Sequence, residues 1–427
     1  MASRGGNLKV LVLFFILLSI AVRGQAKVSL NSECYMLDQG PSSKVQGGHV
    51  TELFELASVS KVVTSYWALH ELGPQFRFST RIFITPVSGN VFDVHIAGSQ
   101  DPFWGRHLTH FLISELNKKG VQEIRRLSFD ENFSMRWLVI SDNIDPENLT
   151  PQEIADTLAR HIRDLANEYP RTRSEAAAVG IDLPRSVRLK AQSVEFVAKA
   201  AFRAPAGTAK MSLKSSPLYR YLKEMNVVSN NHVADRLFEI LGGISGFQTF
   251  VQDKMGLDIR DVHFINGSGD SIVRTDGNGN QVKDYNKATC EVVIQVLRQM
   301  QRELKSPYGM DLKDVMAVSG SDGGTLSPRF DSIPNSMVAK TGTVDPAITL
   351  AGLLSTGDGD VYFGLLMSTE SPADWNNARD QVRDKVMDLI QQFGGRRSFN
   401  YVSRDFLPFD GSSGFTISQS PVLSTLP

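Results

Sequence analysis

Hydrophobic positions along the chain fall into two kinds of run, spaced either as strands or as helices. Near the C-terminus three apolar runs, Ser336–Thr343, Ile348–Leu354 and Val361–Ser368, follow one another with short turns between them. Runs of this length and spacing predict an antiparallel meander. Apolar positions then recur every three or four residues over 378–393 and stop at two glycines, which predicts a final helix.

A different pattern fills residues 80–204, where strand-like runs alternate with helical ones. The strand-like runs are Arg81–Pro86, Val91–Ser99, Ile124–Asp130 and Arg136–Ser141. Thr150 to Glu153 form a capping box with proline at the first helical position, so a helix should start there. We expect an inserted domain over 80–204, within a main domain made of 27–79 and 205–427.

Beyond residue 205 the pattern predicts a strand over Thr208–Ser215 and a helix over Leu218–Met225. A second amphipathic helix follows and ends at Gly242 and Gly243. Together with the meander, these elements predict an α+β fold, with an antiparallel sheet flanked by helices and a helical lobe beside it.

The first 26 residues have the pattern of a Sec-type signal peptide. Two basic residues precede an apolar run over 10–22, and small residues follow at 24 and 26. The run is too short to span a bilayer comfortably, although an N-terminal anchor is the alternative. We therefore expect export to the periplasm. Removal of the segment would change the formal net charge from −1 to −4, which excludes a nucleic-acid partner of the backbone-binding kind.

Cys34 and Cys290 are the two cysteines of the chain. An exported pair can form a disulfide, and two buried thiols are the alternative that the sequence leaves open.

Ser58 to Lys61 carry the most informative chemistry. They lie between a strand-like run, Thr51–Leu56, and a helix-like run, Val62–Leu72. A serine that opens a helix is near the positive end of the helix dipole, and a lysine three positions later lies on the same face. A neutral lysine can take the serine proton, as in acylating enzymes that use no histidine.

The stretch from Lys340 to Thr343 lies on the first strand of the meander. A lysine with two hydroxyls on one side of a strand edge can hold a carboxylate, and Gly342 would leave room for a ligand. A solubilised edge strand is the structural alternative.

A serine followed two positions later by asparagine occurs five times. Ser141 and Asn143 end a strand and enter a turn. Ser229 and Asn231 join two amphipathic helices, where a short loop can aim both side chains into a cleft. We therefore select Ser229 and Asn231.

In this order the three motifs resemble those of the penicillin-recognising serine enzymes. Further segments are similar to the penicillin-binding protein 4 type, the DacB or S13 family of D-alanyl-D-alanine carboxypeptidases and endopeptidases. These segments are Phe54–Lys61, Leu72–Phe78, Asn266–Gly269 and Ala339–Gly352. Two departures stand out: Asn266 replaces the family's aspartate, and the insert is shorter than usual for the family.

The resemblance implies a transpeptidase/β-lactamase-like fold and a serine hydrolase that acts on peptidoglycan peptide stems and cross-links. The implied catalytic residues are Ser58, Lys61 and Ser229, with the backbone N–H groups of Ser58 and Thr343 as the oxyanion hole. The implied substrate-binding residues are Asn231, Lys340, Thr341, Gly342 and Thr343. Penicillins would act as inhibitors, no cofactor is implied, and the oligomeric state is unknown.

Three alternatives remain. A β-lactamase is disfavoured because 171 residues separate Ser58 from Ser229 and because Ile113 stands where a deacylating glutamate would be. An esterase of the same fold and a catalytically silent binding module are the others. His107 and His110 lie on one helical face, but no third ligand is evident, so we expect no metal site.

Overall fold

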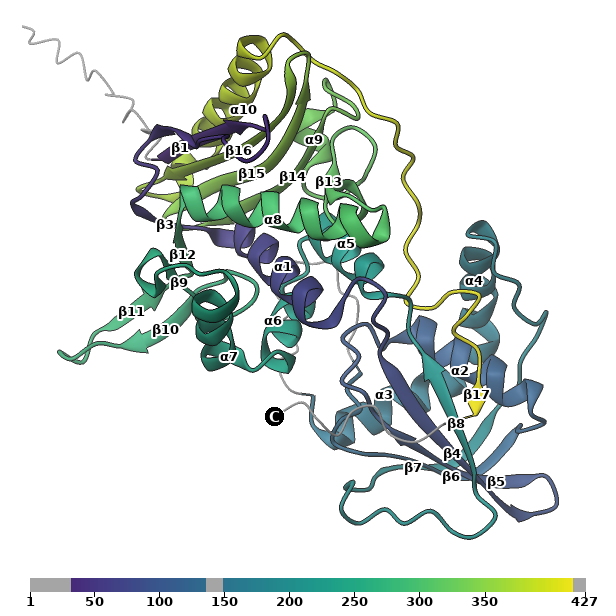
Figure 1. Cartoon of the computed structure of the whole chain (residues 1–427). Coiled ribbons are helices and arrows are strands. Elements are labelled where there is room, and N and C mark those ends of the chain that lie inside the picture. The colour runs from purple at the N-terminus through teal and green to yellow at the C-terminus, as the bar shows by residue number, and fades with distance from the viewer. Residues whose placement is uncertain (1–31, 136–148, 418–427) are drawn as a thin grey trace, which may run out of the picture.

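The structure is a computed structural model that describes residues 32–135 and 149–417 (Figure 1). The predicted signal peptide and the predicted strand Arg136–Ser141 lie outside these residues. None of the helices in the described ranges is both long and apolar enough to cross a membrane.

The main domain is built on a six-stranded antiparallel sheet in the order β13-β14-β15-β16-β1-β2. Its strands are β1 (Ser32–Leu37), β2 (Gln46–Gly48), β13 (Ala317–Val318), β14 (Met337–Val344), β15 (Ala347–Thr356) and β16 (Gly359–Ser368). The predicted meander is therefore confirmed as β14, β15 and β16. Its strands are almost wholly apolar because helices cover both faces of the sheet.

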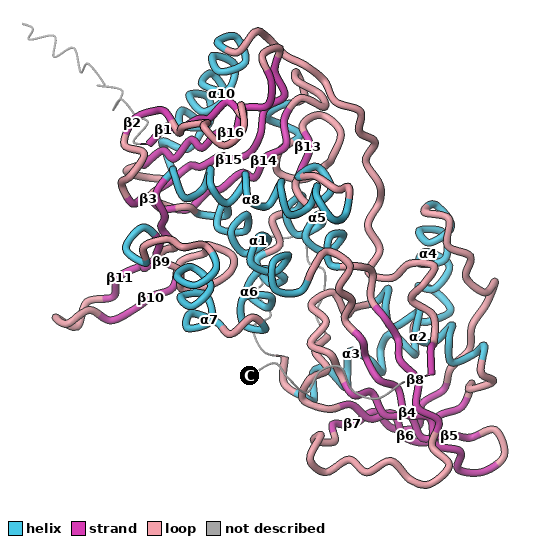
Figure 2. Tube along the Cα trace, in the orientation of Figure 1, coloured by secondary structure: helices cyan, strands magenta, loops and turns pink. Residues whose placement is uncertain are grey.

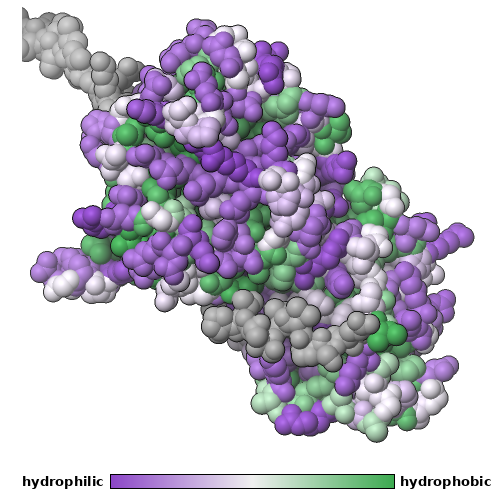
Figure 3. Space-filling model, in the orientation of Figure 1, coloured by the Kyte–Doolittle hydropathy of each residue, from purple (hydrophilic) through white to green (hydrophobic). Residues whose placement is uncertain are grey.

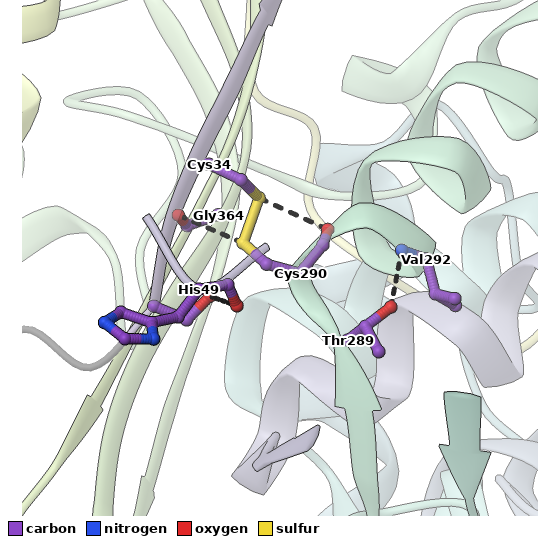
Figure 4. Close-up of a disulfide and its surroundings, with 7 residues drawn as sticks. Cys34, His49, Thr289, Cys290, Val292 and Gly364 are labelled. Carbon is purple, nitrogen blue, oxygen red and sulfur yellow. Dashed lines mark hydrogen bonds between the residues drawn. A yellow bond between two sulfur atoms is a disulfide. The ribbon is translucent and has the colours of Figure 1, made fainter. Parts of the chain in front are cut away.

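The two covering helices are α8 (Cys290–Tyr308) on one face and α10 (Trp375–Gln392) on the other (Figure 1). Successive residues of β15 alternate between the two cores: Leu350 packs in the α10 core, and Ala351 packs in the core that contains α8. Figure 4 shows the disulfide that joins Cys34 of β1 to Cys290 at the start of α8. The open question about the cysteines is thus settled in favour of the bridge.

A helical lobe lies beside this sheet. It contains α1 (Ser60–Leu72), α5 (Leu218–Val228), α6 (Asn231–Ile240) and α7 (Gly243–Thr249), followed by one π-helical turn, η2 (Phe250–Lys254). Trp67 of α1 is buried against the rings of Phe238, Phe247 and Phe250, with centroids 5.4 to 5.8 Å away. The tryptophan therefore fixes the position of α1 within the lobe.

Short elements link the larger helices and strands of the main domain. They are β3 (Leu53–Glu55), η1 (Ala57–Val59), η3 (Ile259–Asp261), β9 (Val262–His263), β10 (Ile272–Thr275), β11 (Gln281–Asp284), β12 (Lys287–Thr289), η4 (Leu312–Asp314), α9 (Ser327–Phe330) and η5 (Pro372–Asp374). Strands β3, β12 and β9 form a small antiparallel sheet, and β10 and β11 form a hairpin that projects from the molecule (Figure 2).

The insert is a second body with its own sheet, in the order β17-β8-β4-β5-β6-β7, and its own hydrophobic core (Figure 1). Its elements are β4 (Ser79–Ser88), β5 (Val91–Ala97), α2 (Arg106–Lys118), β6 (Glu123–Phe129), α3 (Pro151–Arg163), α4 (Leu165–Ala178), β7 (Lys190–Phe196), β8 (Ala209–Lys214) and β17 (Thr416–Ile417). The capping box at Thr150 is present and begins α3. Strands β5, β6 and β7 are parallel, and the remaining pairs are antiparallel.

The expected boundary of the insert at residue 204 is wrong. Strand β8 pairs with β4, so the insert's sheet continues to Lys214. The segment after Gly395 also returns to the insert, where Leu407 and Phe409 are buried in its core and β17 pairs with β8. Figure 1 shows this yellow segment crossing from α10 to β17, so the end of the described chain ties the two bodies together.

Candidate active site

Ser58 occupies the middle of η1, the turn that leads from β3 into α1. Its neighbours Ala57 and Val59 are fully buried, whereas Ser58 is half-buried. Ala57 has a φ of +47°, in the left-handed region that a residue with a Cβ rarely adopts. Such strain persists only where the surrounding structure enforces it, and it is common at functional sites. The turn thus holds the Ser58 hydroxyl at the edge of a rigid core.

Lys61 is completely buried on the first turn of α1. Its Nζ donates hydrogen bonds to Ser58 Oγ at 2.9 Å, Asn231 Oδ1 at 2.7 Å and the Ser268 carbonyl at 2.9 Å. Burial lowers the pKa of Lys61 from 10.5 to about 8, and the carboxylates of Asp235 and Asp270 oppose that shift. Burial is thus the cause of the decrease.

These three contacts fit a neutral amine as well as a charged one. A neutral amine has two N–H bonds and one lone pair. The Asn231 and Ser268 oxygens can only accept hydrogen bonds, so they take the two N–H bonds. The lone pair then faces Ser58, whose hydroxyl can donate. This arrangement suits a general base that takes a proton from Ser58.

Ser229 is the C-cap of α5 and adopts the left-handed conformation, with a φ of +57°. The next residue, Asn230, caps α6 by accepting a hydrogen bond from Val233 N at 3.1 Å. Asn231 is therefore the first residue of α6, and its Nδ2 donates to Asp270 Oδ2 at 3.3 Å. The tight junction of two helices brings Ser229 and Asn231 to the same site as Lys61.

Lys340 lies on β14 just beyond the two residues that pair with β13, where this strand becomes the sheet's edge. Its side chain is nonetheless buried, and its Nζ donates to Ser229 Oγ at 2.9 Å and to the Thr341 carbonyl at 2.8 Å. Burial, together with the charges of Lys61 and Arg329, lowers the pKa of Lys340 well below 10.5. A solubilising role for this lysine is therefore excluded.

Gly342 lets β14 lie directly against the nucleophile turn. A Cβ at this position would stand 2.9 Å from both the Ala57 Cβ and the Leu56 carbonyl oxygen, and 2.2 Å from Thr349 Oγ1. The sequence suggested room for a ligand here, whereas this space is filled by protein. The residue before Thr343 thus lies directly against η1.

The two threonines that flank Gly342 differ in environment. Thr341 is buried, and its hydroxyl donates to Thr325 Oγ1 at 2.8 Å. Thr343 is half-buried. Thr343 is therefore the more accessible of the two hydroxyls that the sequence assigned to substrate binding.

The sequence patterns assigned no role to the loop Asn266–Gly269 or to the nearby carboxylates of Asp235 and Asp270. The Ser268 carbonyl accepts from Lys61, and its N–H donates to Asp235 Oδ1 at 2.7 Å. Asp235 is half-buried, and its partial removal from water raises its pKa to about 6. The resemblance of this loop to the family's Asp-Gly-Ser-Gly could have indicated that it belongs to the site. The contact with Lys61 itself could not be predicted, because it is made by a backbone carbonyl that every residue has.

Other candidates lie elsewhere. Ser141 and Asn143 fall outside the described residues. His107 pairs with Glu175 at 2.7 Å, whereas His110 faces a different group of side chains, so the two histidines do not share a site.

The fold and the site define a serine hydrolase of the penicillin-recognising class, as the sequence predicted. A sequence model of the D-Ala-D-Ala carboxypeptidase 3 (S13) family matches residues 46–137 and 186–388, which is more than half of the chain. The protein therefore belongs to the S13 family, which confirms the predicted family.

Relatives include carboxypeptidase Rv3627c of Mycobacterium tuberculosis, which is 25% identical over 77% of this chain and 74% of its own length. A predatory endopeptidase of Bdellovibrio bacteriovorus, Bd3459, is 37% identical and superimposes with a TM-score of 0.82 over 91% of this chain and 100% of its own. That structure is a complex with the immunity protein Bd3460.

A second structure of Bd3459 is acylated by penicillin G, and it is 36% identical to this chain with a TM-score of 0.80 over the same shares. Penicillin-binding protein 4 (dacB) of Haemophilus influenzae is 16% identical, with a TM-score of 0.56 over 85% of this chain and 97% of its own. The last match shows the fold alone, and it confirms the predicted α+β class.

Proposed function

We propose that this protein cleaves the peptide bond after D-alanine in peptidoglycan peptides through an acyl-enzyme on Ser58. The observation that carries the proposal is the 2.9 Å contact between Ser58 Oγ and Lys61 Nζ, in a buried site where the lysine pKa is about 8. Lys61 accepts the Ser58 proton as the hydroxyl attacks the carbonyl carbon. The backbone N–H groups of Ser58 and Thr343 stabilise the developing oxyanion.

Collapse of the tetrahedral intermediate requires a proton on the leaving amine. Lys340 donates to Ser229 Oγ, which leaves the Ser229 O–H free to donate toward the leaving group. Asn231 positions the substrate amide. Lys340 and Thr343 hold the terminal carboxylate, and Thr341 supports them through its carbonyl, which accepts from Lys340, and its hydroxyl, which donates to Thr325. Gly342 keeps their strand against the nucleophile turn. Water then releases the acyl group from Ser58.

The preferred substrate is the cross-link between two peptide stems. The 37% identity to a predatory peptidoglycan endopeptidase over most of the chain supports cross-link cleavage, and carboxypeptidase activity would use the same residues. We further propose that residues 1–26 direct export and that the protein works in the periplasm. The Cys34–Cys290 disulfide supports an oxidising compartment.

The test is digestion of purified cross-linked muropeptide dimers and of pentapeptide monomers, with the products identified by mass. The proposal predicts that dimers are converted to monomers and that Ser58→Ala converts neither substrate. A silent binding module would be acylated by penicillin but would leave both substrates intact. An esterase would cleave simple esters without releasing D-alanine or separating the dimers.

A further inference from the structure

Three side chains from different helices of the insert meet outside the peptidase site. They are His110 of α2, His161 of α3 and Glu168 of α4, and each offers a ligand atom within 4.8 Å of the other two. His161 Nδ1 lies 3.2 Å from Glu168 Oε2, and His110 Nε2 lies 3.9 Å from the same oxygen. The two imidazole rings are nearly perpendicular, with an interplanar angle of 87°.

The His110 ring is completely buried, and only one of its nitrogens is satisfied. Nδ1 shares a hydrogen bond of 2.8 Å with Thr172 Oγ1. Nε2 has no hydrogen-bond partner among the described residues, and 3.9 Å is too long for a bond to Glu168. A buried polar nitrogen without a partner is costly and calls for an explanation.

We propose that His110, His161 and Glu168 bind a zinc ion. Zinc bonds to histidine nitrogen and carboxylate oxygen are about 2.0–2.2 Å long, so ligand atoms of a tetrahedral site are separated by about 3.4 Å. The separations of 3.2 and 3.9 Å lie on either side of that value, so small side-chain movements would close the site. A cation between the three groups would give His110 Nε2 its missing partner.

The surroundings suit a metal ion. Thr172 fixes the orientation of the His110 ring, as outer partners of metal-bound histidines do. Arg106 and Arg160 are nearby cations, and the charge of Arg106 is paired with Glu175 at 3.1 Å.

The sequence gave no third ligand beside His107 and His110, and we therefore expected no metal. The fold supplies different partners for His110, from helices about 50 and 58 positions further along the chain. With two histidines and one carboxylate, the site has three protein ligands and leaves a fourth position for water. Because the ligands come from three helices, the ion would hold α2, α3 and α4 together and stabilise the insert.

The test is zinc binding by the purified full-length protein. After treatment with a chelator and dialysis, ZnCl₂ is titrated in a calorimeter, and metal retained after gel filtration is measured by plasma mass spectrometry. The proposal predicts about one zinc ion per chain and a higher thermal midpoint with zinc. Cobalt(II) substitution should give the visible absorption bands of a tetrahedral site.

The decisive variant is Glu168→Gln, because this side chain is one-third exposed and its loss need not disturb the core. It should lose zinc retention and the cobalt bands while keeping its circular dichroism spectrum. Thr172→Val should weaken zinc binding about 10–100-fold. The matched control is His107→Ala, which removes a histidine one turn earlier on α2 and should retain the ion.

Stoichiometric zinc in the native protein and in His107→Ala, with loss in Glu168→Gln, supports the site. A native protein that retains no zinc, or equal retention in Glu168→Gln, would overturn it. Neither result depends on peptidase activity.

Discussion

Gly269 lies directly against Ala57, so that a Cβ at position 269 would stand 1.9 Å from the Ala57 carbonyl oxygen. The same atom would lie 2.4 Å from Ser60 Oγ, and the glycine has a φ of +80°. The loop that supplies an acceptor to Lys61 is thus pressed against the turn that carries Ser58. The two segments are more than 200 residues apart in the sequence, and their contact fixes the geometry of the nucleophile.

Gly269→Ala should therefore displace the nucleophile turn. We expect a loss of about 1–3 kcal/mol in the free energy of unfolding and much slower acylation by penicillin, because either the loop or η1 must move. Urea denaturation and the rate of adduct formation measure the two effects.

Gly279→Ala is the matched control for this change. Gly279 has a similar φ of +84°, but nothing lies within 4 Å of its ideal Cβ. The control should show the cost of the backbone conformation alone and keep its acylation rate. Equal acylation rates in the two variants would contradict the packing role of Gly269.

Acylation of Ser58 should rise with pH through an apparent pKa of about 8. Only the neutral form of Lys61 can accept a proton, and that form predominates above its pKa. Asn231→Asp places a carboxylate 2.7 Å from Lys61 Nζ, which favours the charged lysine and raises its pKa. Each unit of increase would lower the neutral fraction at pH 7 about tenfold.

The measurement is the pH dependence of penicillin acylation, in which the midpoint should move to higher pH in Asn231→Asp. Asn230→Asp is the control, because it adds the same charge one residue earlier and aspartate also caps helices well. A midpoint that does not differ between these two variants would argue against Lys61 as the base.

Loss of the disulfide should destabilise the main domain. We expect Cys34→Ala/Cys290→Ala to lower the free energy of unfolding by about 2–5 kcal/mol, because the bridge closes a long loop of chain. Urea denaturation with and without reductant measures this effect. Reductant should lower the stability of the native protein and leave the double variant unchanged; a native protein that reductant does not affect would contradict the bridge.

The returning C-terminal segment should stabilise the insert. Phe409 is fully buried, and its ring stacks on Phe111 with centroids 4.3 Å apart. Phe409→Ala should cost about 3–5 kcal/mol and increase amide hydrogen exchange in α2 and β8. Val402→Ala, at a position 76% exposed on the same segment, should change neither quantity. Unchanged exchange in the insert of Phe409→Ala would show that the segment is dispensable there.

The central site could be predicted from sequence because each motif combines a distinctive residue pattern with a recognisable element. Ser58 and Lys61 are three residues apart at a strand-to-helix junction, and the structure joins them by a hydrogen bond. The meander could also be predicted from the sequence. Helices cover both faces of its sheet and every residue of β15 is buried, so its strands are continuous apolar runs. In contrast to these buried strands, the visible face of the main domain is largely hydrophilic (Figure 3).

The remaining features depend on partners that are distant in the chain. Strand β8 was expected as a strand, but its partner β4 lies about 130 residues earlier, so its membership of the insert could not be read locally. Strand β17 has two residues and follows a polar segment without periodicity. Ser268 acts through its backbone carbonyl, and because every residue has a backbone carbonyl, the residue type at position 268 does not predict this role.

The most direct test of the account is the mass of the intact protein after incubation with benzylpenicillin, followed by peptide mapping of the adduct. Ser60→Ala is the control, because this nearby hydroxyl is buried and has no hydrogen-bond partner among the described residues. We expect one adduct on Ser58 in the native protein and in Ser60→Ala, and none in Ser58→Ala. An unmodified native protein, or an adduct that persists in Ser58→Ala, would contradict it.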